Sequence, residues 1–597
     1  MNENVFTARL DQFRALLRKN GVQAAIVPQA DPHQGEYLAP HWQVRRWLSG
    51  FTGSAGDLVV TDHRAALWTD SRYFLQAAQQ LEGTGIELMK SGLPETLSIA
   101  QYLCQVLNSG DTVGIDGLLF TQAQVNELKA ALGAKDIKLV TNLDVIDEIW
   151  SERPALPEGK IFVHELRFSG RKASDKIASI LEDARGKGCE TVFECMLDSI
   201  AWTLNIRCND VKHTPVATSF LYLASGASKL FIDSAKLSDE TRAYLAGEGV
   251  DVLPYNEVKA FLSSLPSDEK VLVDASHTAY ELLNILGERA TDGGISAANR
   301  FKSVKNAVEL EGIRNAMLRD GVAMVRSLME IKRRVGAGEP TDELAVAEIL
   351  RHYRSMGENY TDESFGTIAG YGPHGAIVHY EASAESSSAL KPEGLLLIDS
   401  GAQYFDGTTD ITRTIALGNP TAEEKRDFTL VMKGHIALAQ AVFPQGTCGT
   451  QLDVLAHQYL WQHGLNYLHG TGHGVGHFLS VHEGPHSIRM NYVGHPVLAG
   501  TVTSNEPGLY VEGIHGIRCE NLVECVPAMT TEYGQFLRFE TLTLCPFERS
   551  LFDLSLMTEN EIKWVNGYHA TVASRLMPLL ATDEERRWLS EATLPLS

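Results

Sequence analysis

The sequence has no uninterrupted apolar run of about 18 residues, which excludes a membrane-spanning helix of ordinary length. The first residues, MNENVFTARLDQFRALLRKNG, also lack the continuous apolar stretch of a secretory signal peptide. Apolar positions recur there among charges at helical spacing, which predicts an amphipathic helix whose apolar face comprises Phe6, Leu10, Phe13, Leu16 and Leu17. We therefore expect no membrane partner.

Cysteine is scarce and scattered. The eight cysteines, at positions 104, 189, 195, 208, 448, 519, 525 and 545, form no CxxC pair. This distribution argues against a disulfide framework and against thiolate-bound structural zinc. Reduced, buried thiols are typical of cytoplasmic proteins, so we expect a cytoplasmic location.

Basic residues are in deficit. The 52 lysines and arginines stand against 75 aspartates and glutamates, for a formal net charge of -23. A nucleic-acid partner is not expected, because phosphate binding needs a concentrated basic surface. The composition, 44% hydrophobic and 21% charged, is typical of a folded protein. At about 150 residues per domain, the length suggests three or four domains.

Two segments of the N-terminal half resemble each other. From Gly21, an apolar strand pattern leads through RWLSG to LWTDS and a helix from Tyr73; after Gly188 a similar pattern leads through AWTLN to LFIDS. Trp47 would then correspond to Trp202. We interpret this as two copies of one α/β unit, with chance similarity of two α/β domains as the alternative.

Two boundaries divide the chain. The first boundary lies in SERPALPEGK (151–160), where prolines and a glycine interrupt the first pattern. The second lies near Arg300, before a long predicted amphipathic helix. We predict an α/β (α+β) protein with domains at 1–154, 155–300 and 301–597.

The C-terminal half contains two acidic pairs. In LLLIDSGAQYFDGTTDITRTIALG, two strands flank a glycine-rich turn, with Asp399 and Asp410 eleven residues apart. In VTSNEPGLYVEGIHGIRCENLVECV, Glu506 and Glu520 are fourteen residues apart in a similar arrangement. Strand ends aim carboxylates rigidly, and we expect the two hairpins to face each other.

Four carboxylates at close range would raise one another's pKa unless cations compensated them. Oxygen ligands with an imidazole suit Mn²⁺, Co²⁺ or Fe²⁺, and two such ions about 3.5–4 Å apart would bind and activate one water. Taken singly, each acid could equally be a helix cap or a surface residue. Asp362 and Asp406 are expected to be solvated turn acids.

The stretch YLHGTGHGVGHF (467–478) has three histidines and four glycines. A dinucleotide loop would need an acid about 20 residues on and a flanking strand and helix, and a P-loop would need GK[ST]; neither pattern is present. Glycine disfavours a helix, so we expect a strand or loop in which the glycines let the backbone approach buried metal ligands. On a strand, His477 would share a face with His473 and line the pocket wall.

These residues resemble the "pita-bread" metallopeptidases, the group of methionine aminopeptidase, prolidase and aminopeptidase P. The motifs DSGAQYFDGTTDITRT, NYLHGTGHGVG, VHEGP, NEPGLY and GIRCENLV occur in the family's order, as do the N-terminal GSAG and LWTDSRYFLQAA. The run is most similar to the long, three-domain cytosolic Xaa-Pro aminopeptidases. The resemblance implies two creatinase-like N-terminal α/β domains followed by a catalytic pita-bread domain with a C-terminal extension.

The resemblance also implies the ligands of two divalent metal ions, with Mn²⁺ expected and Co²⁺, Zn²⁺ or Fe²⁺ as alternatives. Asp410 and Glu520 would bridge both ions, Asp399 would bind one, and His473 with Glu506 would bind the other. His379, His469, His482 and Arg518 match further catalytic positions of the family. His486 and His495 are expected to be structural.

The implied reaction is attack of a metal-bridging hydroxide on the carbonyl before the proline of an Xaa-Pro-Yaa peptide. Glu506 would act as general base, His482 would stabilise the oxyanion, and His379 and His469 would border the proline pocket. Arg518 would orient a carboxylate or a histidine. The alternatives are an Xaa-Pro dipeptidase, a methionine aminopeptidase and a non-catalytic peptide-binding relative. The resemblance also implies a homodimer. Trp461 is a candidate for its interface, with a position in the core as the alternative.

Overall fold

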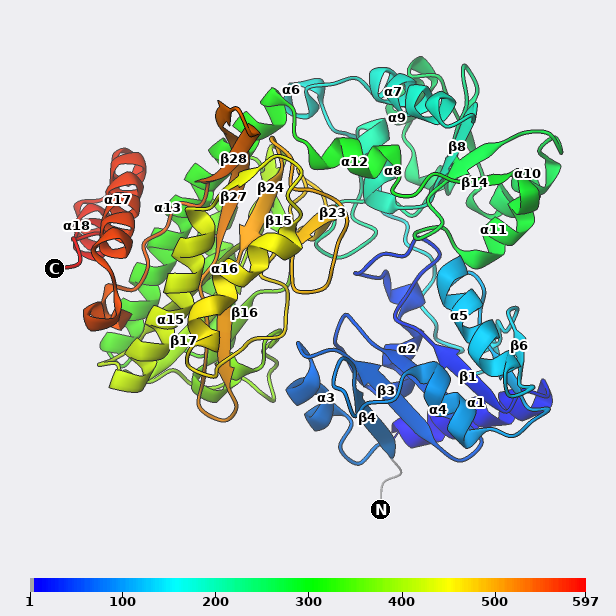
Figure 1. The fold of residues 1–597 in the computed structure, drawn as a ribbon, viewed down its shortest axis with the longest axis horizontal. Coiled ribbons are helices and arrows are strands. Elements are labelled where there is room, and N and C mark those ends of the chain that lie inside the picture. Colours follow the sequence, from blue (N-terminus) through cyan, green and yellow to red (C-terminus); the bar gives the residue numbers. More distant parts are fainter. Residues whose placement is uncertain (1–4) are drawn as a thin grey trace. The chain divides into compact units, whose positions relative to one another are not determined.

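The computed structural model describes residues 5–597 and divides into two compact units. The first unit extends to His164 and continues over Arg171–Asn299; the second comprises Glu165–Gly170 and Arg300–Ser597 (Figure 1). Within the described residues, no helix has the length and apolar character needed to cross a membrane. The predicted N-terminal amphipathic helix is confirmed as α1 (Val5–Lys19), which buries Leu10, Phe13, Leu16 and Leu17.

The first unit contains two six-stranded sheets with one topology. Their strand orders are β4-β3-β2-β1-β5-β6 and β12-β11-β10-β8-β13-β14. In each sheet the third strand of this order, β2 or β10, is antiparallel to both of its neighbours, and all other neighbouring pairs are parallel. The first sheet comprises β1 (Ala24–Val27), β2 (Asp57–Thr61), β3 (Ala65–Thr69), β4 (Ile86–Lys90), β5 (Thr112–Gly114) and β6 (Lys138–Val140). The second comprises β8 (Thr191–Glu194), β10 (Phe220–Leu223), β11 (Ser228–Phe231), β12 (Val250–Leu253), β13 (Val271–Val273) and β14 (Ala290–Asp292).

This shared topology confirms the internal repeat. Trp47 lies in α2 (Val44–Ser49) and Trp202 in α8 (Leu197–Leu204), and each helix follows the first strand of its sheet. The LWTDS and LFIDS motifs end the corresponding strands β3 and β11. The helix predicted from Tyr73 is confirmed as α3 (Phe74–Gln80), with Tyr73 at its N-cap position.

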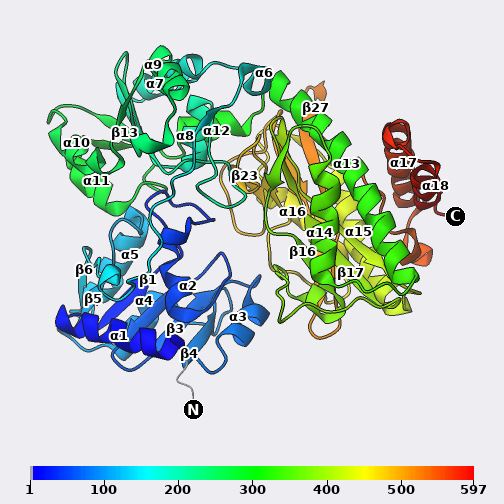
Figure 2. The ribbon, with the colours of Figure 1, turned by 180° about the vertical axis from the view of Figure 1, so that it is seen from behind.

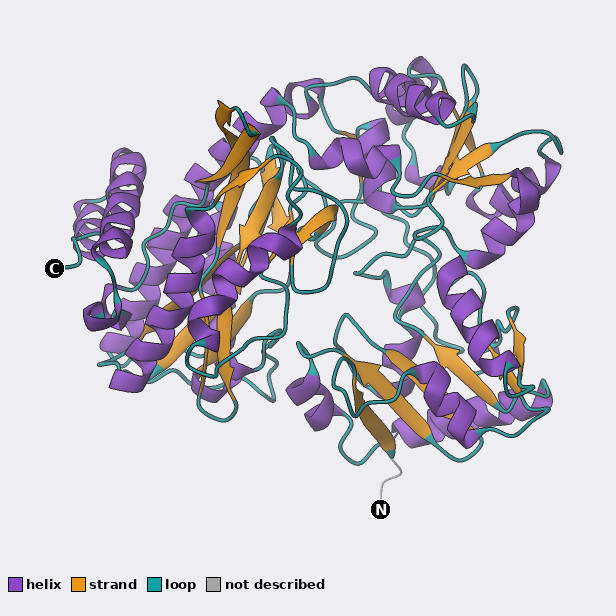
Figure 3. Ribbon diagram, in the orientation of Figure 1, coloured by secondary structure: helices purple, strands orange, loops and turns teal. Residues whose placement is uncertain are grey.

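The remaining helices of the first unit pack against these sheets (Figure 3). They are α4 (Ile99–Val106), α5 (Gln122–Gly133), α7 (Ala173–Gly186), α9 (Asp239–Gly247), α10 (Val258–Ser264) and α11 (Tyr280–Leu286). Strands β7 (Phe162–Val163) and β9 (Ile206–Arg207) form a separate pair. Helix α12 (Ala297–Ser303) leads into the second unit, which also includes α6 (Leu166–Ser169).

The second unit is built from long helices around several sheets. The helices are α13 (Ala307–Gly336), α14 (Glu343–Ser355), α15 (Ala422–Ala439), α16 (Gly449–Trp461), α17 (Glu559–Leu576) and α18 (Asp583–Ala592). Asn306 and Glu309 form a capping box that starts α13, as Thr421 and Glu424 do for α15. Both views show α13 and α15 running along the strands (Figures 1 and 2). Buried apolar residues of α13, α15 and α17 share one core with strands of this unit.

Three sheets and a hairpin make up the strands of the second unit. A six-stranded sheet has the order β21-β28-β27-β24-β22-β23, and two three-stranded sheets have the orders β16-β17-β20 and β15-β18-β19. The strands of the large sheet are β21 (Val442–Pro444), β22 (Gly472–Gly474), β23 (Glu483–Ile488), β24 (Val502–Asn505), β27 (Asn521–Thr531) and β28 (Gly534–Thr541). The others are β15 (Tyr360–Glu363), β16 (Ile368–Tyr371), β17 (Leu395–Ser400), β18 (Ala402–Tyr404), β19 (Gly407–Thr408), β20 (Ile411–Ala416), β25 (Gly508–Val511) and β26 (His515–Arg518).

The two predicted acidic hairpins are the pairs β17–β20 and β24–β27, each antiparallel. The expected simple turn is wrong in both cases, because a second short hairpin is inserted: β18–β19 in the first pair and β25–β26 in the second. Strand β18 pairs with β15 as well, so the inserted segment extends a separate sheet. The flanking strands nevertheless stay in register and bring the acids of each pair together.

Candidate functional site

The two strand pairs meet at their acidic ends. Asp399 lies near the end of β17 opposite Thr412 of β20, and Asp410 directly precedes β20. Glu506 directly follows β24 and Glu520 directly precedes β27. The backbone N–H of Glu520 donates to the carbonyl of Thr412 at 3.1 Å, and the Thr412 hydroxyl donates to Glu520 Oε2 at 2.9 Å. The prediction that the two hairpins face each other is therefore confirmed.

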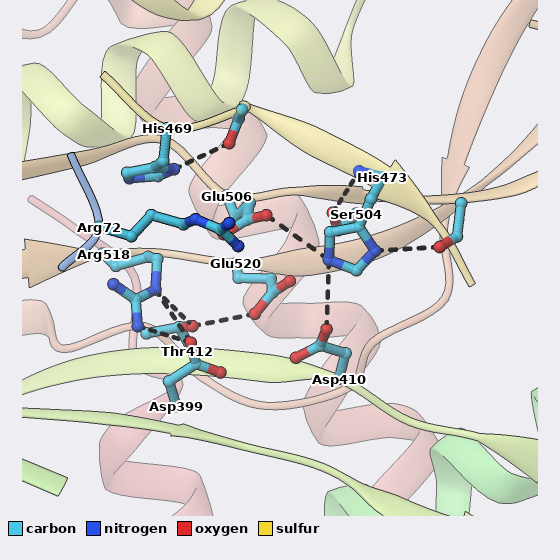
Figure 4. A network of polar contacts seen from close by, with 12 residues as sticks. Arg72, Asp399, Asp410, Thr412, His469, His473, Ser504, Glu506, Arg518 and Glu520 are labelled. Atoms are coloured by element: carbon cyan, nitrogen blue, oxygen red, sulfur yellow. Dashed lines mark hydrogen bonds and ion pairs between the residues drawn. The ribbon is translucent and has the colours of Figure 1, made fainter. Parts of the chain in front are cut away.

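His473 lies in the short strand β22 with its imidazole directed at the acids (Figure 4). Its Nδ1 donates to the carbonyl of Gly474 at 3.0 Å, so in the neutral ring Nε2 carries the lone pair that a metal ligand needs. Nε2 lies 3.5 Å from Asp410 Oδ2 and 3.5 Å from Glu506 Oε1. The backbone N–H of His473 donates to Ser504 Oγ at 2.9 Å, which fixes β22 against β24.

Close contacts with neighbouring strands require the glycines that flank His473. A Cβ at Gly472 would lie 2.1 Å from the carbonyl oxygen of Ser504, and one at Gly474 would lie 2.3 Å from that of Glu483. The glycines thus admit the backbones of the neighbouring strands. Close approach of adjacent strands is what positions His473.

The expected position of His477 is wrong. Strand β22 ends at Gly474, so the alternation that would place His477 on the face of His473 does not continue. The His477 imidazole is buried and lies next to Gly312 of α13, where a Cβ would be 3.2 Å from its Nε2. Its position is set by helix packing.

The four acids carry more negative charge than the surrounding protein neutralises. Burial, together with the negative charge of Asp399, raises the pKa of Glu520 to about 7. Burial, and then the charges of Glu520, Asp399 and Glu506, raise the pKa of Asp410 well above its ordinary value. Arg518, which is 1% exposed, donates to Asp399 Oδ2 at 2.6 and 3.0 Å. Four carboxylates and one guanidinium leave an excess of three negative charges when all are ionised.

The donor set fits divalent metal ions. The ligand atoms of Asp410, His473 and Glu520 all lie within 4.8 Å of one another. The buried oxygens Asp399 Oδ1 and Glu520 Oε1 accept no hydrogen bond from any described residue, as expected of atoms that ligate a cation. Carboxylate oxygens with one imidazole suit Mn²⁺, Fe²⁺, Co²⁺ or Zn²⁺.

A hydrogen-bonded chain links this centre to His469. Arg518 Nη1 donates to the Tyr510 hydroxyl at 2.6 Å, and that hydroxyl lies 2.8 Å from His469 Nε2. Because His469 Nδ1 donates to the carbonyl of Gly470 at 2.8 Å, Nε2 of the neutral ring accepts from Tyr510. Burial raises the pKa of Tyr510, which keeps its hydroxyl protonated. Tyr510 is not among the residues predicted from the sequence. In the register of β25–β26, Gly508 lies opposite Arg518, which places Tyr510 diagonally across from Arg518.

The remaining predicted residues also lie around this centre. The His482 ring centroid is 4.3 Å from that of His473. His379 follows Val378, whose carbonyl accepts a hydrogen bond from Arg518 Nη2 at 3.2 Å. His486 is buried, and its Nε2 lies 2.9 Å from the hydroxyl of Thr503, in keeping with a structural role.

One turn acid differs from the prediction. Asp406 is 7% exposed and forms an ion pair with Arg319 of α13, so it is not a solvated turn residue. Asp362 is exposed as expected, but it lies in strand β15 and not in a turn.

Family models match the chain in consecutive blocks. The model of the creatinase/prolidase N-terminal domain matches residues 9–149, and a second model of that description matches residues 152–309. The model of metallopeptidase family M24 matches residues 311–527, and that of the C-terminal region of this family matches residues 535–596.

Whole-chain relatives are similar along nearly the entire length. Aminopeptidase P2 of Arabidopsis thaliana is 39% identical, with 99% of this chain and 89% of the relative covered. A probable Xaa-Pro aminopeptidase P of Laccaria bicolor is 40% identical, with 99% and 94% covered. The crystal structure of X-prolyl aminopeptidase from Caenorhabditis elegans, described as a cytosolic enzyme with a di-nuclear active site, is 36% identical with a TM-score of 0.94, and 99% of each chain is covered.

Proposed function

The chain belongs to the aminopeptidase P group of metallopeptidase family M24, and we propose that it is a metal-dependent Xaa-Pro aminopeptidase. It hydrolyses the bond between an N-terminal residue and a penultimate proline in short peptides. The observation that carries this proposal is the convergence of four carboxylates and His473 at one centre, in a chain similar over its full length to enzymes of that name.

The proposed metal ligands are Asp399, Asp410, His473, Glu506 and Glu520. Contacts of His473 Nε2 with Asp410 and Glu506, both at 3.5 Å, support one ion shared by these three side chains. Asp399 Oδ1 and Glu520 Oε1, which accept no hydrogen bond from the described residues, support a second ion that these two carboxylates would help to hold. Bound there, two divalent ions would supply a nucleophile at neutral pH by acidifying a water molecule, and would polarise the scissile carbonyl. The metal is proposed to be Mn²⁺.

Glu506 is the proposed general base. Its side chain is 17% exposed and that of His473 is 18% exposed, whereas Asp410 and Glu520 are buried, so these two residues face the side open to substrate. Glu506 takes a proton from the attacking water and passes it to the proline nitrogen as the C–N bond breaks. His482 is proposed to donate a hydrogen bond to the carbonyl oxygen as negative charge develops there, which its ring position beside His473 supports.

Arg518, His469 and His379 complete the proposed site. Arg518 holds Asp399 through two hydrogen bonds and His469 through the Tyr510 hydroxyl. Both His469 and His379 are proposed to border the proline pocket. A proline-specific pocket matters because proline has no N–H to donate and its ring fixes φ, so a cleft that binds extended strands accepts it poorly.

Peptide cleavage by the metal-stripped protein, with and without added Mn²⁺, tests this function. The substrates are an Xaa-Pro-Yaa tripeptide, an Xaa-Pro dipeptide and a Met-Ala-Ser control, with products identified by mass spectrometry. Mn²⁺-dependent loss of only the first residue of the proline tripeptide is expected. Cleavage of the dipeptide alone would identify an Xaa-Pro dipeptidase, and no cleavage with any divalent ion would overturn the enzymatic assignment.

Three further properties are proposed on the same basis: domains at 1–154, 155–300 and 301–597, a cytoplasmic location and a homodimer. Trp461 lies on α16 and is 44% exposed. Its Nε1 donates to Asn466 Oδ1 at 2.8 Å, which holds the indole in place. The side chain thus presents a rigid apolar surface of the kind found at interfaces. Light scattering of the wild type and of Trp461→Glu tests the dimer, and a monomeric wild type would refute it.

A further inference from the structure

A buried carboxylate outside the metal centre, that of Glu343, binds the segment that carries His379. Glu343 begins α14 and is 0% exposed. Its oxygens accept hydrogen bonds, at 2.8 to 3.0 Å, from the backbone N–H groups of Tyr371 and Ser388, the hydroxyl of Tyr380 and Nδ1 of His374. Every donor belongs to the segment 371–388.

The donors come from both ends of the segment and from its middle, so one side chain closes it into a loop. The backbone N–H of Glu343 also donates to the carbonyl of Ser388 at 3.3 Å. The rings of His374 and Tyr380, two of the donors, stack with centroids 4.5 Å apart. Loss of this carboxylate would leave the four donors without their shared acceptor and would loosen the segment on this side.

The other side of the segment rests on the proposed active site. The carbonyl of Val378, the residue before His379, accepts from Arg518 Nη2 at 3.2 Å. Gly375 of the segment packs directly on Gly516 of β26, where a Cβ would lie 1.7 Å from the Gly375 carbonyl oxygen. The segment is therefore held between Glu343 on one side and the strand that carries Arg518 on the other.

We propose that Glu343 is a positioning residue that sets where His379 borders the pocket for the penultimate proline. The inference rests on the proposed function and adds to it a determinant of substrate specificity. Glu343 makes no contact with the metal ligands among the hydrogen bonds and ion pairs recorded for the described residues. Its loss should consequently affect proline recognition and leave the metal centre intact.

The test compares Glu343→Gln with the wild type and with Glu348→Gln, an exposed position on the same helix whose side chain is 66% exposed. A glutamine keeps the shape but turns one acceptor into a donor facing the N–H groups of the segment. For the Mn²⁺-loaded full chain, kcat/KM for an Xaa-Pro-Yaa tripeptide should fall roughly tenfold or more, mainly through KM, because displacement of a pocket residue by about 1 Å can cost that much. Preference for proline over alanine at the second position should fall as well, and Glu348→Gln should match the wild type.

Two further readouts separate positioning from loss of structure. Bound metal per chain should stay at the wild-type value, and hydrogen exchange should rise in residues 371–388 and not in β17 or β24. Tyr380→Phe, which removes one donor and keeps the ring stack, should change KM in the same direction by a smaller factor. Unchanged kinetics and proline preference in Glu343→Gln would overturn the inference, as would loss of kcat and bound metal with unchanged KM. A wild type that cleaves none of the peptides would instead refute the proposed function.

Discussion

Removal of the metal ions should make the protein's stability fall as the pH rises towards neutrality. Without bound metal ions, the buried carboxylate of Glu520 ionises next to Asp399 and Asp410, and the positive charge of Arg518 offsets only part of that cost. Burial first, and the charge of Asp399 next, raise the pKa of Glu520 from 4.5 to about 7. Because the folded protein binds this proton more tightly than the unfolded chain does, protonation stabilises the fold.

The sign and size of the effect follow from that shift. The stabilisation is fully present below pH 4.5 and is lost as the pH rises through about 7. A shift from 4.5 to about 7 corresponds to about 3 kcal/mol of unfolding free energy. Solvent does not screen the group, since Glu520 is 1% exposed. For a unit of this size, the melting temperature should drop by roughly 5–10 °C.

Thermal unfolding of EDTA-treated and Mn²⁺-loaded protein between about pH 5 and pH 8 measures the effect. Glu520→Gln is the reference, because it removes the titrating group and leaves other acid-linked changes in place. Metal-free wild type should lose stability relative to metal-free Glu520→Gln as the pH rises. Metal-loaded wild type should show no such loss, because the cations keep the carboxylate ionised at little cost. Parallel pH profiles for the two metal-free proteins would refute the reasoning.

Three other changes give further tests. Glu506→Gln should lower kcat about 10²- to 10⁴-fold in steady-state assays, and a kcat near the wild-type value would exclude Glu506 as general base. Tyr510→Phe removes the hydroxyl at the centre of the arginine–histidine link and should lower kcat/KM roughly tenfold, so an unchanged value would leave that link without a function. Gly472→Ala places a Cβ 2.1 Å from the Ser504 carbonyl and should destabilise the protein by about 3 kcal/mol in thermal unfolding. Gly470→Ala, whose Cβ would make only a 3.5 Å contact, is the matched control, and equal stability of the two variants would contradict the packing argument.

The sequence alone was sufficient for features set by local pattern. The repeated tryptophan and aspartate motifs predicted two similar α/β sheets, because each motif occupies the same place relative to its own strands. The acidic pairs were predicted to meet because each acid lies at the end of an apolar strand, where the period-two alternation fixes the side-chain direction. Asp399 and Glu520 lie where those patterns put them.

Only the tertiary structure decided features that depend on partners distant in the chain. The sequence predicted Asp406 to be a solvated turn acid, but in the folded protein it pairs with Arg319 of α13. The glycines beside His473 allow the backbones of neighbouring strands to approach. Glu343 carries no motif, and its donors lie between 28 and 45 residues further on. Whether a polar group is paired or solvated depends on which elements pack against it, and short-range sequence patterns do not encode that packing.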